Sequence, residues 1–233
     1  MLYQLFLFYL GFTIAEDFEY VLLFLENYSA DPPKNVELYV ASRSEFQVNV
    51  TITNPNGGDD IISSPINFTL DPNVVRMVTI SPDARQTGEL ENKAIKVVGS
   101  GDIIVYALNR NLYSTDGFTA FSIDQVEKEY YAMAYTADRT DDYTQIGLVA
   151  VEDGATDVDV TVPADTTVQW NSQTYTAGQT FRITLSEKYK TAQVKSETGD
   201  LTGIVHLFII LVKHILLSVI LIWSNILLLK KMN

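Results

Sequence analysis

Apolar and polar positions alternate along most of the chain in short runs that predict β-strands. The runs are rich in β-branched and aromatic residues, and Gly, Pro, Asn and Asp separate them. They cover residues 19–25, 36–42, 46–52, 74–80, 93–98, 102–108, 145–152, 157–162 and 180–185. In two of the runs the apolar residues fall on one face: Val48, Val50 and Ile52, and Val158, Val160 and Val162. The pattern predicts an all-β body of antiparallel sheets, each with one buried face.

Two parts of this body match each other at one offset of about 110 residues, which indicates an internal duplication. The pair Glu19-Tyr20 aligns with Glu129-Tyr130, and Val50-Thr51 aligns with Val160-Thr161. Leu38 and Val48 likewise align with Leu148 and Val158. We therefore predict two related β-sandwich-like repeats, at about 18–110 and 128–203. The counterparts of the strands within 92–109 would begin near Ile204, where an apolar tail starts, so we expect the second repeat to be incomplete.

The N-terminal residues 1–15 are typical of a secretory signal peptide. An apolar stretch is followed by Thr13 and Ala15, the small residues of a cleavage site, and then by acidic residues. Three sequons, each Asn-X-Ser/Thr without proline, agree with a secreted or extracellular location. Their acceptors are Asn27, Asn49 and Asn67.

The tail, residues 204–233, has two interpretations. As a C-terminal apolar helix, residues 210–229 could span a bilayer, with Lys230 and Lys231 on the cytoplasmic side of a type I anchor. Alternatively, a Leu-, Ile-, Lys- and Asn-rich run without acidic residues is what a translated AT-rich noncoding stretch, entered near Gly203, would give. The sequence leaves both interpretations open.

Composition excludes several kinds of chemistry. Acidic side chains number 29 against 16 basic ones, for a net charge of −13, so nucleic acid is not an expected partner and basic or neutral partners are favoured. There is no cysteine, which excludes disulfides and thiolate metal sites. The two histidines, His206 and His214, both lie in the tail. The body therefore has no histidine for a zinc site or a Ser-His-Asp triad.

Acidic clusters and tyrosines are the remaining candidates for a site. The acidic clusters are Asp59-Asp60, Asp138 with Asp141-Asp142, and Glu152-Asp153 with Asp157 and Asp159. They could bind calcium or hydrolyse a glycoside, but their spacing fits neither the EF-hand loop nor a defined carboxylate pair. We expect no metal, no cofactor and no catalysis. Tyr113, Tyr130, Tyr131 and Tyr135 could form an exposed binding patch or, as is more common, cover the core edge.

One long stretch resembles a known family. It reads "NKAIKVVGSGDIIVYALNRNLYSTDGFTAFSIDQVEKEYYAMAYT", with "FEYVLLFLENY" before it and "GLVAVEDGATDVDVTVP" after it. Over residues 18–203 the chain resembles the IgGFc-binding protein N-terminal domain family. The run from Asn92 through Asn109, Tyr113 and Asp116 to Tyr130-Tyr131 is its most specific part. After "DLTG" the sequence departs from the family pattern.

The resemblance implies an extracellular β-rich module without catalysis, of the kind found in mucus-associated and cell-surface proteins. Fc binding, attributed to the namesake, does not carry over to a domain that departs from the family pattern. We therefore expect residues 16–203 to form a glycoprotein recognition or adhesion module that binds an extracellular protein or glycoprotein. The first alternative is a single-pass membrane receptor anchored by residues 210–229. A remote alternative is an acid-dependent hydrolase that uses the acidic turns.

Overall fold

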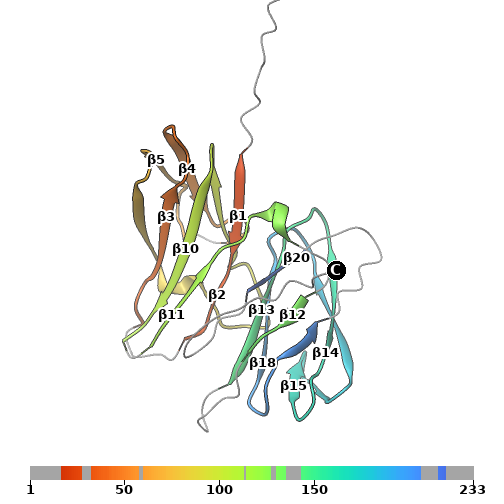
Figure 1. The fold of residues 1–233 in the computed structure, drawn as a ribbon. Coiled ribbons are helices and arrows are strands. Elements are labelled where there is room, and N and C mark those ends of the chain that lie inside the picture. Colours follow the sequence, from red (N-terminus) through yellow and green to blue (C-terminus); the bar gives the residue numbers. More distant parts are fainter. Residues whose placement is uncertain are drawn as a thin grey trace, which may run out of the picture.

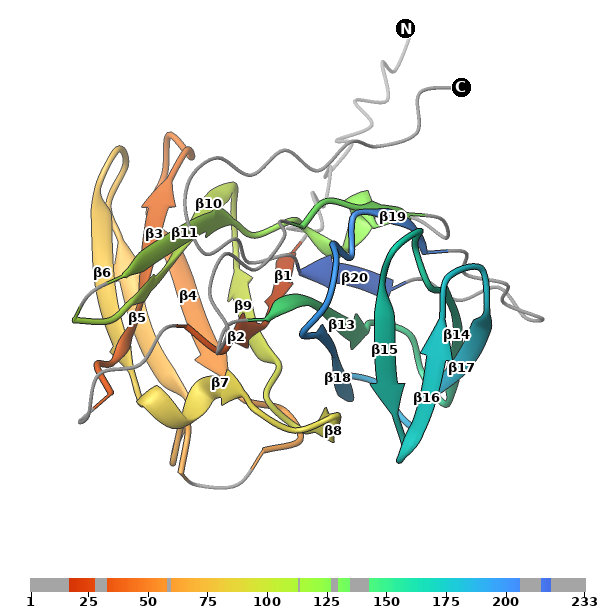
Figure 2. The same ribbon diagram turned by 90° about the horizontal axis from the view of Figure 1, so that it is seen from below.

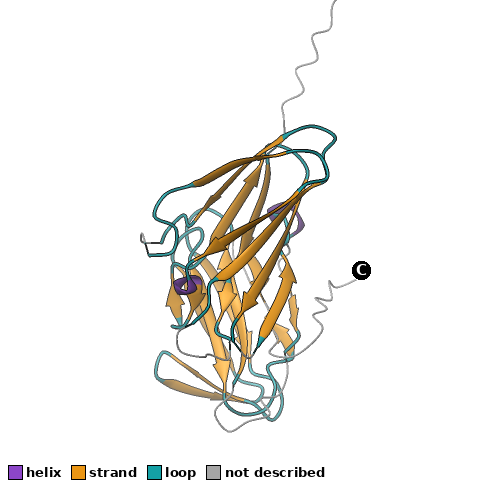
Figure 3. Cartoon of the chain, turned by 90° about the vertical axis from the view of Figure 1, so that its left-hand side faces the viewer, coloured by secondary structure: helices purple, strands orange, loops and turns teal. Residues whose placement is uncertain are grey.

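The computed structural model describes residues 17–27, 33–57, 60–112, 114–126, 130–134, 143–205 and 215–218. Over these residues the protein is all-β, as the alternation predicts. The only helices in the described ranges are two single 3₁₀ turns, η1 (Pro82–Ala84) and η2 (Ile123–Gln125). Figure 3 shows both turns among the strands.

The first half of the chain forms a sandwich of two four-stranded antiparallel sheets (Figure 1). One sheet has the order β1 (Phe18–Leu22), β9 (Ile95–Gly99), β4 (Val48–Thr53) and β5 (Ile66–Leu70). The other has the order β11 (Thr115–Thr119), β10 (Ile103–Arg110), β3 (Val36–Ser42) and β6 (Val75–Ile80). The inward residues of both sheets form one core, which includes Val50 and Ile52 from β4 and Val40 and Val105 from the facing sheet. The predicted one-sided burial of β4 is thus observed.

The second half is built from shorter strand pairs around its own core (Figure 2). One sheet has the order β20 (Ile215–Ser218), β13 (Thr144–Ala150), β18 (Thr191–Ser196) and β8 (Leu90–Glu91). Three further pairs are β12 (Tyr130–Ala132) with β19 (Gly203–Val205), β14 (Thr156–Thr161) with β17 (Thr180–Leu185), and β15 (Thr167–Trp170) with β16 (Gln173–Thr176). In the core, the Phe181 ring stacks with the rings of both Trp170 and Tyr175.

The two halves share the same pairing of neighbours. β1 pairs with β9 as β12 pairs with β19, and β3 pairs with β10 as β13 pairs with β20. The register of β3 with β10 also agrees with that of β13 with β20. Leu38 opposes Ala107 in the first pair, and Leu148 opposes Leu217 in the second. Leu148 follows Leu38 by the same number of positions as Leu217 follows Ala107, and this number is the offset found in the sequence. The duplication of the sequence itself stays a prediction.

The strands expected to be missing from the second half are present in part. β19 and β20 occupy the places of β9 and β10, although they have three and four residues against five and eight. Backbone groups make the ladder, so an apolar segment can complete a sheet without matching the side chains of its counterpart. The sequence predicts a second repeat without these strands, and the described residues instead place short strands beside β12 and β13.

The predicted C-terminal apolar helix is not confirmed. In the described part of the chain, the residues that fall within 210–229 form strand β20, and no helix there has the length and apolar character to cross a bilayer. The rest of the predicted anchor and the predicted signal peptide lie outside the described residues.

An apolar cluster and a polar network join the halves. Val21, Leu23 and Leu25 from the first half pack with Val149 and Val151 from the second. A parallel pair of short strands, β2 (Phe24–Leu25) and β7 (Arg85–Gln86), runs along this junction.

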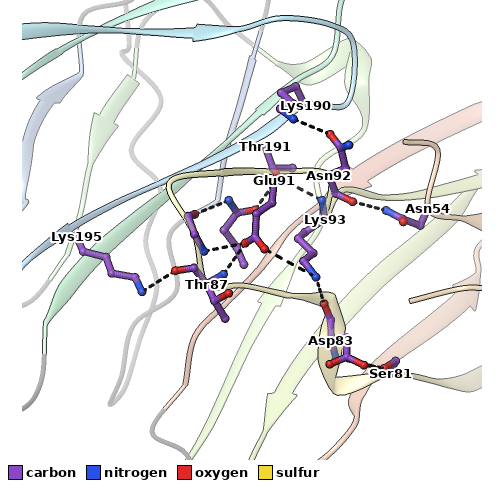
Figure 4. A network of polar contacts seen from close by, with 12 residues as sticks. Asn54, Ser81, Asp83, Thr87, Glu91, Asn92, Lys93, Lys190, Thr191 and Lys195 are labelled. Carbon is purple, nitrogen blue, oxygen red and sulfur yellow. Dashed lines mark hydrogen bonds and ion pairs between the residues drawn. The ribbon is translucent and has the colours of Figure 1, made fainter. Parts of the chain in front are cut away.

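In the network, the Lys190 Nζ donates to Asn92 Oδ1 at 3.1 Å and the Lys93 amide donates to Thr191 Oγ1 at 3.2 Å (Figure 4). The Lys195 ammonium donates to the carbonyl oxygen of Thr87 at 3.2 Å. These hydrogen bonds fix the position of the second half against the first.

Candidate functional site

The outer side of the sheet β11-β10-β3-β6 carries a continuous group of apolar side chains, which we call the apolar face. Its residues are Tyr39, Ala41, Val75, Met77, Ile104, Tyr106 and Leu108. The central row runs across three strands, because Met77 opposes Tyr39 and Tyr39 opposes Tyr106. Met77 is 53% exposed and Tyr106 is 44% exposed. A contiguous exposed apolar area of this kind marks an interaction site more often than chance surface.

Strand β10 shows why the face is apolar. Its inward residues, Ile103, Val105 and Ala107, are buried in the sandwich core. The intervening outward positions include Ile104 and Tyr106, which are half-buried or exposed. Within the part of the chain that the structure describes, no second layer lies over them. A strand with one solvated face ordinarily alternates apolar with polar residues. In β10 the outer positions Ile104, Tyr106 and Leu108 are apolar as well. Both faces of this part of the strand are therefore suited to contact other apolar surfaces.

The apolar face continues over one end of the sandwich, where it meets acidic residues. Val74 and Phe46 lie in the loops at this end and are 44% and 77% exposed. The amide of Ser42 donates to the carbonyl oxygen of Val74 at 3.0 Å, which brings the start of β6 to the end of β3. We call the charged group in these loops the acidic rim. It comprises Glu45, Asp71 and Asp102, with Arg43 paired to Asp102 at 3.4 Å.

One hydrogen bond holds the central tyrosine of the face. The Tyr39 hydroxyl donates to Glu37 Oε2 at 2.9 Å, and Arg110 Nη1 lies 4.0 Å from Glu37 Oε1. The hydrogen bond to this carboxylate raises the pKa of Tyr39. Tyr39 is therefore a neutral, oriented side chain at physiological pH, suited to apolar and hydrogen-bonding contacts.

A buried arginine, Arg85, organises a polar cluster at the other end of the same sandwich. Its guanidinium donates to Asn109 Oδ1 at 2.8 Å and to the carbonyl oxygens of Lys34 and Arg110 at 2.8 and 3.1 Å. Burial lowers the pKa of Arg85. The Asn109 Nδ2 donates in turn to the carbonyl oxygen of Leu25 at 2.9 Å. The cluster is satisfied internally, so its function is structural.

Sequence reasoning missed Arg85, because a basic residue beside a turn is usually solvated. The one signal in the sequence for this buried polar cluster was the amide of Asn109, which belongs to the stretch that carries the family resemblance.

Two members of the predicted acidic cluster of the second half, Asp157 and Asp159, are paired with Arg182. The Arg182 Nε and Nη2 donate to the two Asp159 carboxylate oxygens at 2.7 and 2.8 Å, and Nη1 lies 3.7 Å from Asp157. The hydrogen bonds from Arg182 lower the pKa of Asp159. Asp153 is exposed and lies 4.0 Å from Lys188, and Asp60 is exposed on a turn. An arginine among the carboxylates disfavours a cation at this place.

Most of the other acidic candidates and of the candidate tyrosines fall on residues that the structure does not describe. Asp59, Asp138, Asp141, Asp142, Tyr113 and Tyr135 lie outside the described residues. Tyr130 packs against the second core, as the common interpretation of such tyrosines expects, and only the backbone of Tyr131 is described. Among the side chains that the structure describes, no group of three or more His, Cys, Asp or Glu residues could hold a metal ion.

The three sequons differ in exposure. Asn49 and Asn67 are exposed, whereas Asn27 is buried.

Comparison with known proteins supports the resemblance found in the sequence. A family model described as IgGFc binding protein matches residues 116–205. The match begins within β11 and ends with β19, so it covers the second half, and the resemblance is confirmed over these residues. Searches of curated proteins and of solved structures find no match.

Proposed function

We propose that the protein is a non-catalytic extracellular recognition or adhesion module that binds a protein partner through the apolar face. The observation that carries the proposal is the row Met77–Tyr39–Tyr106, an apolar and partly aromatic strip on a sheet face with exposed side chains. The family match supports an extracellular binding module as the class of protein. The Arg182-bound carboxylates give no support to a hydrolase.

The chemistry of the apolar face indicates what kind of surface the partner should have. Aromatic residues and methionine are enriched at the centre of protein interfaces, and charged residues lie at their rims. The acidic rim and the net charge of −13 favour a partner whose contact surface is apolar at its centre and basic at its edge. Charge complementarity of this kind mainly speeds association and weakens with added salt.

An immunoglobulin Fc is a specific candidate only through the name of the matched family. The match covers residues 116–205, whereas the apolar face lies on β3, β6 and β10, before those residues. We therefore propose a protein partner of the stated chemistry and treat Fc binding as one defined assay.

The tail bears on the choice between the secreted form and the receptor alternative. Residues 215–218 pair with β13 through their backbone. The same residues cannot at once complete this sheet and form the middle of a membrane helix. We propose that the secreted form, with the tail in the sheet, is the functional one.

Substitution of the face should abolish partner binding. Met77→Glu with Tyr106→Glu places two charges at the centre of the face, and removal of central anchors of this kind costs about 2 kcal/mol or more, about a thirtyfold loss of affinity. The wild-type chain, this variant and a control are immobilised and exposed to extracellular fluid and to purified Fc. Thr174→Glu on the exposed strand β16 is the control for added charge.

Proteins retained by the wild type and the control, but lost by the face variant, are the expected partners, and their binding should weaken with salt. Equal retention by all three chains would refute the proposal. A wild-type dimer that Met77→Glu dissolves would instead assign the face to a second copy of the chain.

A further inference from the structure

We propose that the folded, secreted protein carries N-linked glycans at Asn49 and Asn67 but not at Asn27. In sequence the three sites are equivalent, since each satisfies the Asn-X-Ser/Thr rule. The structure separates them by burial and by the hydrogen bonds of their amide groups.

Asn49 and Asn67 form a reciprocal pair on the adjacent strands β4 and β5. Asn49 opposes Thr69, and Thr51 opposes Asn67, so each asparagine faces the hydroxyl of the other sequon. The Thr51 hydroxyl donates to Asn67 Oδ1 at 2.8 Å, and the Thr69 hydroxyl donates to Asn49 Oδ1 at 3.2 Å. All of these contacts lie at the surface, on the outer side of their sheet. The Asn67 Nδ2 also donates to the carbonyl oxygen of Pro65 at 3.2 Å, in a hydrogen bond that lies at the surface. A glycosylated amide keeps one N–H for such a bond, and both asparagine side chains are exposed, so both can carry a glycan in the folded protein.

Asn27 has the opposite environment. It is 6% exposed, and its Nδ2 donates to the carbonyl oxygen of Asn109 at 2.6 Å. The Asn27 Oδ1 accepts from the Ser114 hydroxyl at 2.6 Å. A glycosylated Nδ2 keeps one N–H, but the sugar needs open space beside the nitrogen, and Asn27 is buried. Making that space would require the hydrogen-bonded cluster around Asn109 and Arg85 to open and leave buried polar groups unpaired. A chain glycosylated at Asn27 would not reach this fold, so the secreted protein lacks that glycan.

The positions of the two glycans also give them a function. β5 is an edge strand of the sheet β1-β9-β4-β5, since β4 is its only neighbour among the strands that the structure describes. Unpaired strand edges add strands from other chains unless something blocks them. A glycan on Asn67, with a second about 7–8 Å away on Asn49, covers this edge. The apolar face lies on the other side of the sandwich and stays free, so this inference does not rest on the proposed function.

Mass spectrometry of the full chain secreted from eukaryotic cells tests the assignment. We expect two glycans, which peptide N-glycosidase removes, and the loss of one in each of Asn49→Gln and Asn67→Gln. The variant Ser29→Ala destroys the first sequon without changing Asn27, and it should alter neither the glycan count nor the thermal stability. A third glycan that Ser29→Ala removes, a single glycan, or none would overturn the assignment.

Size-exclusion chromatography tests the shielding role. We expect the double variant Asn49→Gln with Asn67→Gln to self-associate at concentrations at which the glycosylated wild type is monomeric. Gln keeps the amide at both positions, so the loss of the glycans is the main change. A double variant that stays monomeric would overturn the shielding role and leave the site assignment to the mass measurement.

Discussion

Replacing Arg85 with leucine is expected to lower the free energy of unfolding by about 3–5 kcal/mol, a large fraction of the stability of an ordinary domain. Leucine fills part of the volume but donates no hydrogen bond. Asn109 Oδ1 and the carbonyl oxygens of Lys34 and Arg110 would then lose their donor. An unsatisfied buried polar group costs about 1–3 kcal/mol. Because the lost acceptors come from two segments of the chain, the residue Lys34 before β3 and the end of β10, the whole end of the sandwich should loosen.

Denaturant unfolding of the secreted protein measures this loss, and Arg182→Leu is the matched control. The Arg182 side chain also makes bidentate hydrogen bonds, but it lies at the surface, where such pairs contribute about 0–1 kcal/mol. Arg85→Lys keeps the charge and loses the planar fork, so it should not restore stability. If Arg85→Leu and Arg182→Leu cost the same, the cluster at Arg85 does not stabilise the fold as argued.

The strands themselves could be predicted because their signal is local. The run 36–42 coincides with β3 and the run 180–185 coincides with β17, since alternation and turn residues define a strand without reference to its partners. Strands with weaker alternation, such as β5 and β18, escaped because what defines them is pairing with distant residues.

The site was harder to predict because exposure depends on tertiary contacts. Within the run 102–108, residues 103–108 are all apolar, and a strand of this kind is ordinarily covered on both sides. Only the sheet order shows that, among the described strands, none forms a second layer on the outer side of β10. The burial of Asn27 is equally invisible in its sequon, because Ser114 and Asn109 are far away in the sequence.

The tail shows how two predictions from sequence compete. Hydropathy predicts a helix over 210–229, whereas the repeat offset predicts a strand pair that begins near Ile204. Strand β13 is buried at every position, as expected of a strand with neighbours on both sides. In the described residues the backbone of 215–218 provides the second neighbour.

The variant Leu216→Pro is expected to expose the edge of β13 and to cause self-association or proteolysis of the second half. The amide and the carbonyl of Ala150 bond to Lys190 and Tyr189, on the β18 side. Because successive residues of a strand point their polar groups in opposite directions, those of Val149 point to β20, where the partner is Leu216. Proline at 216 removes a ladder donor, with an expected cost of about 1–3 kcal/mol.

The neighbouring variant Leu217→Pro is the matched control, since the amide of residue 217 points away from β13 and proline is tolerated there on an edge strand. Limited proteolysis and light scattering compare both variants with the wild type, and carbonate extraction reports on the membrane. We expect wild-type protein in the supernatant and a defect in Leu216→Pro alone. Wild-type protein that stays in the membrane pellet, with both proline variants equally protease-resistant, would refute strand β20 and favour the anchored receptor. The contrast between two adjacent prolines is decisive because a helix would treat both alike, whereas a ladder distinguishes them.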